Sequence, residues 1–200
     1  EEKQIYKKKI LYTSDKQIVK NLKLKIKVLP KNAKNYLQNK SIFKKIIGNI
    51  KIDNFEGLSV DSRIVKRNNL FLTIKGKNND GNKFIPDALK KGAKYIVSSK
   101  VLKKYKNKTI RVKNEIRFLN QFAKLKRKNS TAKIIAITGS AGKTSLKDLI
   151  KELLQNFENT HSSPKSFNNH FGVPISLSNL SADDKYGIFE VGMSKMGEIN

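Results

Sequence analysis

The chain has 200 residues, 38% of them hydrophobic, which is enough for one large domain or two small ones. It contains no cysteine, so disulfides and thiolate metal sites are excluded, and it has no run of about 18 apolar residues that would predict a membrane span. A chain without cysteine fits a reducing cytoplasm, and we expect a cytoplasmic monomer.

The 43 Lys and Arg residues outnumber the 16 Asp and Glu residues, and the net charge of +27 raises the question of nucleic-acid binding. Nearly all the basic residues are Lys, and they are spread along the whole chain. Proteins that read or stack bases usually combine Arg with aromatic residues, and Arg is scarce here. The pattern favours a Lys-coated surface and no nucleic-acid partner, with a basic nucleic-acid-binding module as the alternative of another class.

Residues 1–40 have the weakest pattern, and we treat them as an extension of uncertain structure. Apolar residues and Lys alternate from Leu22 to Val28, which predicts a half-buried strand. A short helix is expected from an N-cap at Ser41 to a stop at Gly48. Beyond it we expect strands over 57–63, 69–76, Tyr95–Ser98 and 108–112, and helices over 82–91, stopped at Gly92, and over 114–128.

A second unit follows the polar segment 126–133, which resembles a linker. The continuous apolar run 133–138 predicts a strand in the buried interior of a parallel sheet. Residues 143–157 predict an amphipathic helix, and 186–192 a second buried strand. Alternating strands and helices in both units indicate an α/β fold with a parallel sheet. The apolar side of the amphipathic helix comprises Leu146, Leu149, Ile150, Leu153 and Leu154.

The turn "GSAGKTS" between that strand and that helix has the composition of a phosphate-binding loop. Gly139 and Gly142 allow the backbone to approach an anion, and the first N–H groups of the helix point at it. Lys143 can reach the outer phosphates, and the Thr144 hydroxyl can bind Mg²⁺. The spacing departs from the standard P-loop, which has Gly where Ile137 stands, so an ordinary strand–helix turn with an exposed Lys is the alternative.

Glu190 is the single acid in the apolar strand "YGIFEVG". A carboxylate is costly to bury without a partner, and parallel strands that start beside a phosphate loop also end near it. We therefore expect Glu190 to hold Mg²⁺ on the phosphates, with a salt-bridged or rim glutamate as the alternative.

Four segments in order resemble the Mur ligase family, which attaches amino acids to the cell-wall precursor. They are "ITGSAGKTS", the stretch from "VDSRIVKRNN" to "KKGAKYIV", "SFNNHFGVPISL" and "EVGMSKMGEI", and the resemblance covers roughly residues 41–200. "FNNHFG" is similar to the members that add D-alanyl-D-alanine to UDP-N-acetylmuramoyl-tripeptide. The members that add the third stem-peptide residue usually carry Thr-Thr-Pro there, and they are the nearest alternative.

The resemblance implies an α/β fold with a small N-terminal substrate domain at 41–130, followed at 131–200 by the first part of a P-loop-type parallel-sheet ATP-binding domain. The remaining parts of the family lie beyond Asn200, so this piece alone is expected to be inactive. The implied reaction uses ATP and Mg²⁺ to phosphorylate the carboxylate of UDP-N-acetylmuramoyl-tripeptide, after which the amine of D-alanyl-D-alanine attacks the acyl phosphate.

The resemblance also assigns roles to residues of this chain. Lys143 and Glu190 are the expected catalytic residues, and Thr144 and Glu190 the expected Mg²⁺ ligands. The expected ATP-binding residues are Gly139, Ser140, Ala141, Gly142, Lys143, Thr144 and Ser145. The expected substrate-binding residues are Ser62, Arg63, Asp80, Gly81, Asn168 and Asn169.

Each substrate-site assignment has a structural alternative. Asp61 and Arg63 could form a strand-end salt bridge, and the Asp-Gly pair at 80–81 is a turn by default. Asn168 and Asn169 could instead cap the helix that follows. The two histidines, 161 and 170, are expected on the surface or in capping positions rather than in catalysis.

Overall fold

The computed structural model describes residues 32–76, 79–164 and 167–193 of the chain. By its contacts the chain divides into Glu1–Ala33 and Lys34–Asn200, and nearly all described residues belong to the second unit. The strand expected at Leu22–Val28 lies outside the described residues. No helix among the described residues is long and apolar enough to cross a membrane.

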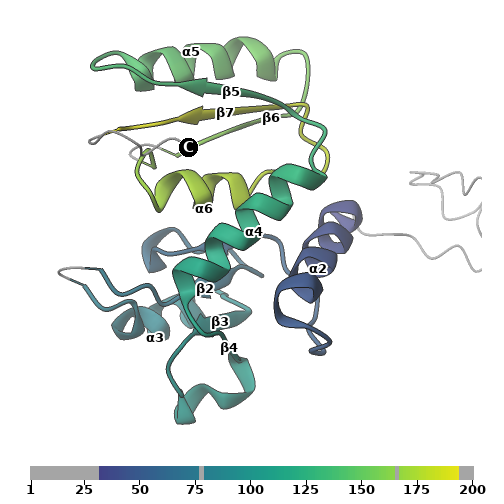
Figure 1. Cartoon of the computed structure of the whole chain (residues 1–200), viewed down its shortest axis with the longest axis vertical. Helices are drawn as coiled ribbons and strands as arrows, with labels where there is room; N and C mark the ends of the chain where they lie inside the picture. Colours follow the sequence, from purple (N-terminus) through teal and green to yellow (C-terminus); the bar gives the residue numbers. More distant parts are fainter. Residues whose placement is uncertain (1–31, 77–78, 165–166, 194–200) are drawn as a thin grey trace, which may run out of the picture. The chain divides into compact units, whose positions relative to one another are not determined.

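The first half of the described chain forms a four-stranded parallel sheet in the order β1-β2-β3-β4, below the centre of Figure 1. The buried faces of its strands enclose an apolar core around Phe43, Phe55, Phe118 and Phe122, whose neighbouring ring centroids lie 6.0–6.1 Å apart. The strands expected at 69–76, Tyr95–Ser98 and 108–112 and the stop at Gly92 (φ 96°) are confirmed. The strand expected at 57–63 is confirmed only at Leu58–Ser59, because the Asp61 side chain caps a 3-10 helix that starts at Ser62. The elements are α2 (Ala33–Ile47), β1 (Leu58–Ser59), η1 (Ser62–Ile64), β2 (Leu70–Leu72), η2 (Gly81–Phe84), α3 (Ile85–Lys90), β3 (Tyr95–Ser98), η3 (Lys103–Lys108), β4 (Thr109–Arg111) and α4 (Glu115–Asn129).

Helix α2 ends before Gly48 (φ 94°) as expected, but the predicted start at Ser41 is wrong. The helix begins at Ala33, and Ser41 lies inside it. After the small Ala33, the next buried side chain of the helix is polar: Asn39 is fully buried and donates hydrogen bonds to the carbonyl oxygens of Phe55 and Glu56. The apolar periodicity is therefore absent where the helix starts.

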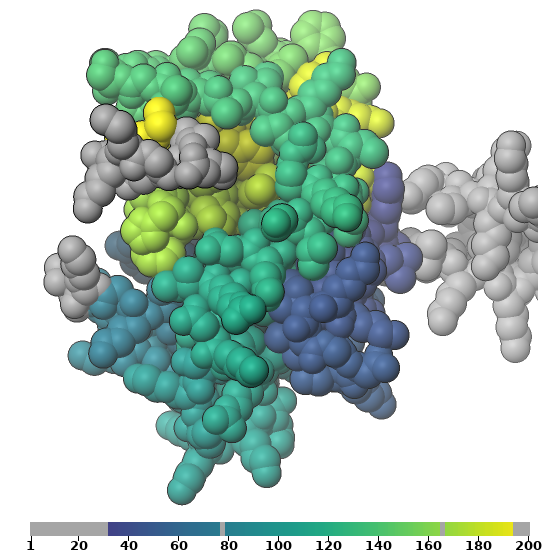
Figure 2. All heavy atoms as spheres, viewed as in Figure 1, coloured from purple at the N-terminus to yellow at the C-terminus, as the bar shows by residue number. Residues whose placement is uncertain are grey.

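The predicted linker at 126–133 is also wrong in its first half, because α4 continues to Asn129. Lys126 is buried, and its ammonium donates hydrogen bonds of 2.7 Å to Asn35 Oδ1 and to Asn39 Oδ1. Figure 2 shows the corresponding packing, with atoms of α2 in blue directly beside atoms of α4 in green. A polar-looking segment is therefore the packed end of a helix, and only residues 130–132 connect it to the next strand.

The second half forms a three-stranded parallel sheet in the order β5-β7-β6, at the top of Figure 1. Its elements are β5 (Lys133–Ile137), α5 (Lys143–Gln155), β6 (Thr160–Ser162), α6 (Gly172–Ser178) and β7 (Tyr186–Glu190). The buried interior position predicted for the strand at 133–138 belongs instead to β7. Strand β5 is at the edge of the described sheet, and its residues are mostly half-buried or exposed. The α/β class with parallel sheets is confirmed.

Helix α5 places its apolar residues on two sides rather than one. Ile150 and Leu154 are half-buried, whereas Leu146, Leu149 and Leu153 are exposed. The most buried side chain of the helix is Lys147. The buried side of α5 therefore carries a lysine just below the glycine-rich turn.

Helix α6 connects the second sheet to the first core. Ile175 is part of the apolar cluster of the first sheet, and Asn179 exchanges hydrogen bonds of 2.9 Å with the backbone N–H and carbonyl of Leu58. Gly57 lies against the same Asn179 side chain, so closely that a Cβ at this position would clash. These contacts fix α6 and its C-terminal end relative to the first sheet.

Candidate functional site: a phosphate loop and a buried glutamate

The glycine-rich turn has the geometry that the sequence predicts. Gly139 (φ 146°) and Gly142 (φ 74°) both adopt positive φ values, which residues with a Cβ rarely adopt. Gly142 is the N-cap of α5 and no side chain caps it, so the first N–H groups of this helix are available to an anion. Residues 139–142 are exposed.

Lys143 lies over this turn. Its ammonium donates a hydrogen bond of 2.6 Å to the Gly139 carbonyl and a longer one of 3.4 Å to the Ser140 carbonyl. The positive charge is thus held at the mouth of the turn. The Lys143 ammonium can bind a phosphate there once it has left one or both carbonyls.

Thr144 and Glu190 are brought together by the sheet. Glu190 pairs with Ile137 at the end of β5, and the Val191 N–H donates a hydrogen bond of 2.8 Å to the Ile137 carbonyl. The hydroxyl of Thr144, the second residue of α5, donates a hydrogen bond of 2.8 Å to Glu190 Oε2. The expectation that the acid lies beside the loop is confirmed.

Glu190 is only 4% exposed, and several groups stabilise its charge. Asn168 Nδ2 donates a hydrogen bond of 2.9 Å to Oε1. This bond, the one from Thr144 and the charges of Lys147 and Lys143 lower the pKa of Glu190, against burial, which raises it. The carboxylate is therefore ionised, and with the Thr144 hydroxyl it offers the oxygen donors that Mg²⁺ prefers.

The two adjacent asparagines have different positions. Asn168 contacts Glu190, as described, and its carbonyl accepts a hydrogen bond of 2.7 Å from Gly192 N–H. Asn169 Oδ1 accepts hydrogen bonds from the N–H groups of Phe171 and Gly172, at 3.0 and 2.8 Å. Asn169 therefore stabilises the start of α6, the alternative considered for it, and only Asn168 is at the loop.

The two histidines have no contact with the loop among their described interactions. His161 Nε2 lies 2.9 Å from the Ser176 carbonyl, and burial lowers the pKa of this histidine to about 4, so it is neutral. Of the two positions expected for His161, the structure has the capping one, because Ser176 lies in the last turn of α6. His170 is exposed and packs against the ring of Phe171 at 3.9 Å between centroids.

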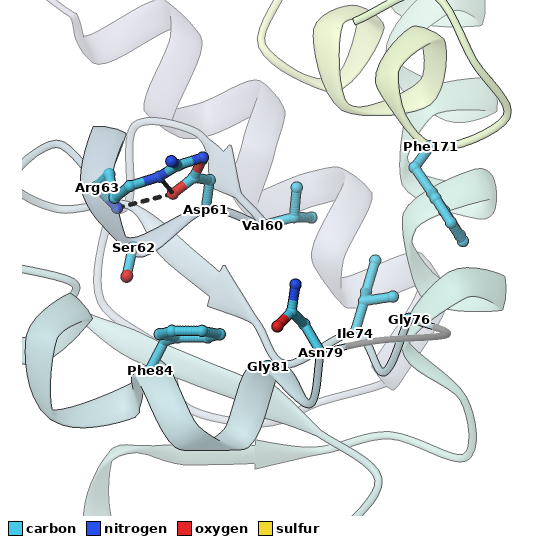
Figure 3. A pocket seen from close by; sticks show the side chains of 10 residues that line it. All are labelled: Val60, Asp61, Ser62, Arg63, Ile74, Gly76, Asn79, Gly81, Phe84 and Phe171. Carbon is cyan, nitrogen blue, oxygen red and sulfur yellow. Dashed lines mark hydrogen bonds and ion pairs between the residues drawn. The ribbon is translucent and has the colours of Figure 1, made fainter.

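A cavity of about 450 Å³ lies beside the first sheet. In Figure 3, Ser62 and Arg63 line one side of it, and Phe171, which precedes α6, enters from the opposite side. Ser62 is buried, whereas the Arg63 side chain is 86% exposed and is paired with Asp61, Nη2 to Oδ2, at 2.7 Å. The lining residues are Val60, Asp61, Ser62, Arg63, Ile74, Gly76, Asn79, Gly81, Phe84 and Phe171.

The Asp80–Gly81 pair has a clear structural role at the edge of this cavity. Asp80 Oδ1 accepts hydrogen bonds from the backbone and side chain of Asn82, and Oδ2 pairs with Lys100 at 2.9 Å. Hydrogen bonds from Asn82 hold the pKa of Asp80 well below its usual range. A Cβ on Gly81 would lie 2.8 Å from the Ile74 carbonyl oxygen, so only glycine fits. Gly81 lines the cavity, and Asp80 shapes the turn beside it.

Sequence reasoning missed three residues of these sites. Lys147 lies within 4 Å of Glu190, and its position four residues after Lys143 in a helix was the available signal. Ser163 Oγ accepts a hydrogen bond of 3.1 Å from the Glu190 N–H, and nothing in its sequence context indicates this. Phe171 lines the cavity only because α6 packs against the first sheet.

Family models match most of the described chain. The Mur ligase family catalytic domain matches residues 54–127, and the Mur ligase middle domain matches residues 137–200. The chain therefore belongs to the Mur ligase family.

Curated relatives and solved structures agree with this. The chain is 43% identical over 148 residues to the UDP-N-acetylmuramoyl-tripeptide–D-alanyl-D-alanine ligase of Rickettsia prowazekii, covering 74% of this chain and 33% of that protein. The crystal structure of MurF from Acinetobacter baumannii has the same fold, with a TM-score of 0.64 at 24% identity over 82% of this chain and 36% of that one. The structure of Thermotoga maritima MurF ligase in complex with ADP has a TM-score of 0.52 at 28% identity, covering 68% and 31% of the two chains. The chain spans about a third of the length of the curated relatives it matches.

Proposed function

We propose that the protein is an ATP-dependent ligase that adds D-alanyl-D-alanine to UDP-N-acetylmuramoyl-tripeptide through an acyl phosphate. The observation that carries the proposal is the 2.8 Å contact between Thr144 and the buried Glu190 carboxylate beside a glycine turn with open helix N–H groups. The D-alanyl-D-alanine ligase name of the Rickettsia relative supports the choice of substrates. We assign residues 41–130 to precursor binding and residues 131–200 to ATP binding.

The chemical problem of this reaction is charge repulsion. The substrate carboxylate must attack the γ-phosphate of ATP, and both groups are anionic. The ammonium of Lys143 and the N–H groups that open α5 contact the phosphates and stabilise the charge on the transferring phosphoryl group. Their fixed positions around the turn supply this stabilisation without reorganisation at the moment of transfer. The transfer breaks the bond from the γ-phosphorus to the oxygen that bridges it to the β-phosphate, and ADP leaves. The amine of D-alanyl-D-alanine then attacks the carbonyl carbon of the acyl phosphate, forming the amide and releasing phosphate.

Thr144 and Glu190 fit a divalent cation, because they present a hydroxyl and an ionised carboxylate oxygen within 2.8 Å of each other. We assign Mg²⁺ to these two residues. When bound there, the ion neutralises phosphate charge. Asn168 fixes the second carboxylate oxygen, so Glu190 can keep one orientation throughout the reaction.

The cavity beside the first sheet is the proposed site for the uridine diphosphate part of the substrate. Ser62 offers a buried hydroxyl, and Phe84 and Phe171 offer aromatic faces for a base or a sugar. Arg63 is the candidate for the diphosphate, and it must share or leave Asp61 to bind it. Gly81 has no Cβ, so the backbone at the rim of the cavity can pack directly against the backbone of Ile74.

Phosphate release by the complete protein tests the proposal. In ATP and Mg²⁺, we expect phosphate release from the pair UDP-N-acetylmuramoyl-tripeptide and D-alanyl-D-alanine. We expect no phosphate release from the pair UDP-N-acetylmuramoyl-dipeptide and a diamino acid. The opposite result would assign the protein to the members that add the third stem-peptide residue.

One variant distinguishes the ligase function from the nucleic-acid-binding alternative. If the protein is a ligase, Lys143→Ala weakens ATP binding by about 10- to 100-fold, the usual worth of a hydrogen bond to a charged group. If it is a nucleic-acid-binding module, it binds DNA with a steep salt dependence that this substitution leaves unchanged.

A further inference from the structure

Lys147 is a buried cation that the proposed reaction does not use. Its side chain is 1% exposed, and its ammonium lies 3.9 Å from Glu190 Oε2 and 3.6 Å from Asp148 Oδ1. A buried ammonium is costly unless an opposite charge compensates it. The surroundings of the two carboxylates decide which one provides the compensation.

Glu190 is the stronger partner despite the slightly longer distance. The Asp148 side chain is 53% exposed, so water screens its interaction with the ammonium. The Glu190 side chain is 5% exposed, so its interaction with Lys147 acts across a much drier environment. The charge of Lys147 also contributes to lowering the pKa of Glu190, after the hydrogen bonds from Asn168 and Thr144.

Orientation of the carboxylate does not require Lys147. Asn168 holds Oε1 at 2.9 Å and Thr144 holds Oε2 at 2.8 Å, so both oxygens already have hydrogen-bond donors. What these neutral donors cannot supply is a full positive charge. Lys143 also acts on Glu190, but more weakly than Lys147, and in the proposed reaction the phosphates take up its charge. Without Lys147, the Glu190 carboxylate would therefore repel the triphosphate of ATP at the mouth of the loop.

We propose that Lys147 is the resident counter-ion of Glu190: its buried ammonium offsets the carboxylate charge before the metal arrives, so that the phosphate loop accepts a polyanion. This inference rests on the proposed function. It assigns Lys147 a role distinct from that of Lys143, since Lys143 lies over the loop and contacts the nucleotide, whereas Lys147 acts from beneath through Glu190. Lys147 sets how strongly nucleotide binding depends on Mg²⁺.

The test compares ATP binding by the complete protein in EDTA and in saturating Mg²⁺, using isothermal titration calorimetry. Lys147→Met should weaken ATP binding in EDTA by about tenfold or more, equivalent to ~1.4 kcal/mol, and weaken Mg²⁺·ATP binding much less. The gain in affinity from Mg²⁺ therefore increases. Lys151→Met, which removes the same charge one turn further along α5, should change this gain by less than about twofold, because screening weakens charges at greater distance.

A double variant keeps the test decisive if Lys147→Met does not fold. Glu190→Gln should strengthen ATP binding in EDTA, and adding Lys147→Met to it should return the affinity to about the wild-type value. A smaller Mg²⁺-dependent gain in Lys147→Met, an equal effect of Lys151→Met, or no cancellation in the double variant would overturn the inference. If the wild-type protein bound ATP neither in EDTA nor in saturating Mg²⁺, the proposed function would be overturned, and the inference with it.

Discussion

Lys126 provides a pH-dependent test of how α2 and α4 pack. Burial lowers its pKa from 10.5 to about 7, although its ammonium donates hydrogen bonds to Asn35 and Asn39. The unfolded chain therefore binds one more proton than the folded chain between about pH 7 and pH 10.5. Folding stability should rise with pH across this interval, since protonation favours the unfolded state there. Between pH 7 and pH 10.5 the free energy of unfolding can rise by at most about 5 kcal/mol, at ~1.36 kcal/mol for each pH unit.

The measurement is urea unfolding of the complete protein, followed by circular dichroism from pH 7 to pH 10. The free energy of unfolding of the wild type should rise by about 2–4 kcal/mol relative to that of Lys126→Met over this range, because methionine has no proton to exchange. Lys124→Met, which removes an exposed lysine from the same helix, should follow the wild-type curve. Parallel curves for wild type and Lys126→Met would refute the argument that the Lys126 amine loses its proton in the folded state.

Three further substitutions test the sites. Gly81→Ala should lower the thermal midpoint by several degrees, because its Cβ would lie 2.8 Å from backbone atoms; an unchanged midpoint would contradict the packing. Phe171→Ala should weaken binding of the UDP-linked precursor by about 1–3 kcal/mol in calorimetry, whereas Phe157→Ala, at an 80% exposed position, should not. Asn168→Ala should weaken Mg²⁺·ATP binding about tenfold. Asn169→Ala should lower the free energy of unfolding by about 1 kcal/mol and leave the affinity for Mg²⁺·ATP unchanged. An equal loss of this affinity in both variants would show that the two asparagines do not have distinct roles.

The sequence predicts the parts of the fold that local pattern controls. Apolar runs and glycine stops locate the strands and the ends of α2 and α3. The contact between Thr144 and Glu190 was predictable because neighbouring parallel strands end at the same edge of a sheet. Identification of the loop also did not require the standard P-loop spacing, because an apolar strand and a leucine-rich helix flank it in the sequence.

What the sequence could not predict depends on tertiary contacts. Lys126 and Lys147 look like surface residues, and only a packed partner shows that each is buried. The start of α2 was missed because, after the small Ala33, the next buried residue of the helix is the polar Asn39. Phe171 belongs to the cavity through the packing of α6 against the first sheet, which no local pattern encodes.

The central claim is that Thr144 and Glu190 form one metal–nucleotide site with the glycine loop. A crystal structure of the complete protein with Mg²⁺ and a non-hydrolysable ATP analogue tests this most directly. The account predicts the triphosphate along residues 139–145, with Lys143 on the outer phosphates and Mg²⁺ about 2.1 Å from oxygens of Thr144 and Glu190. A triphosphate bound elsewhere, or a metal ion that contacts neither residue, would contradict the account.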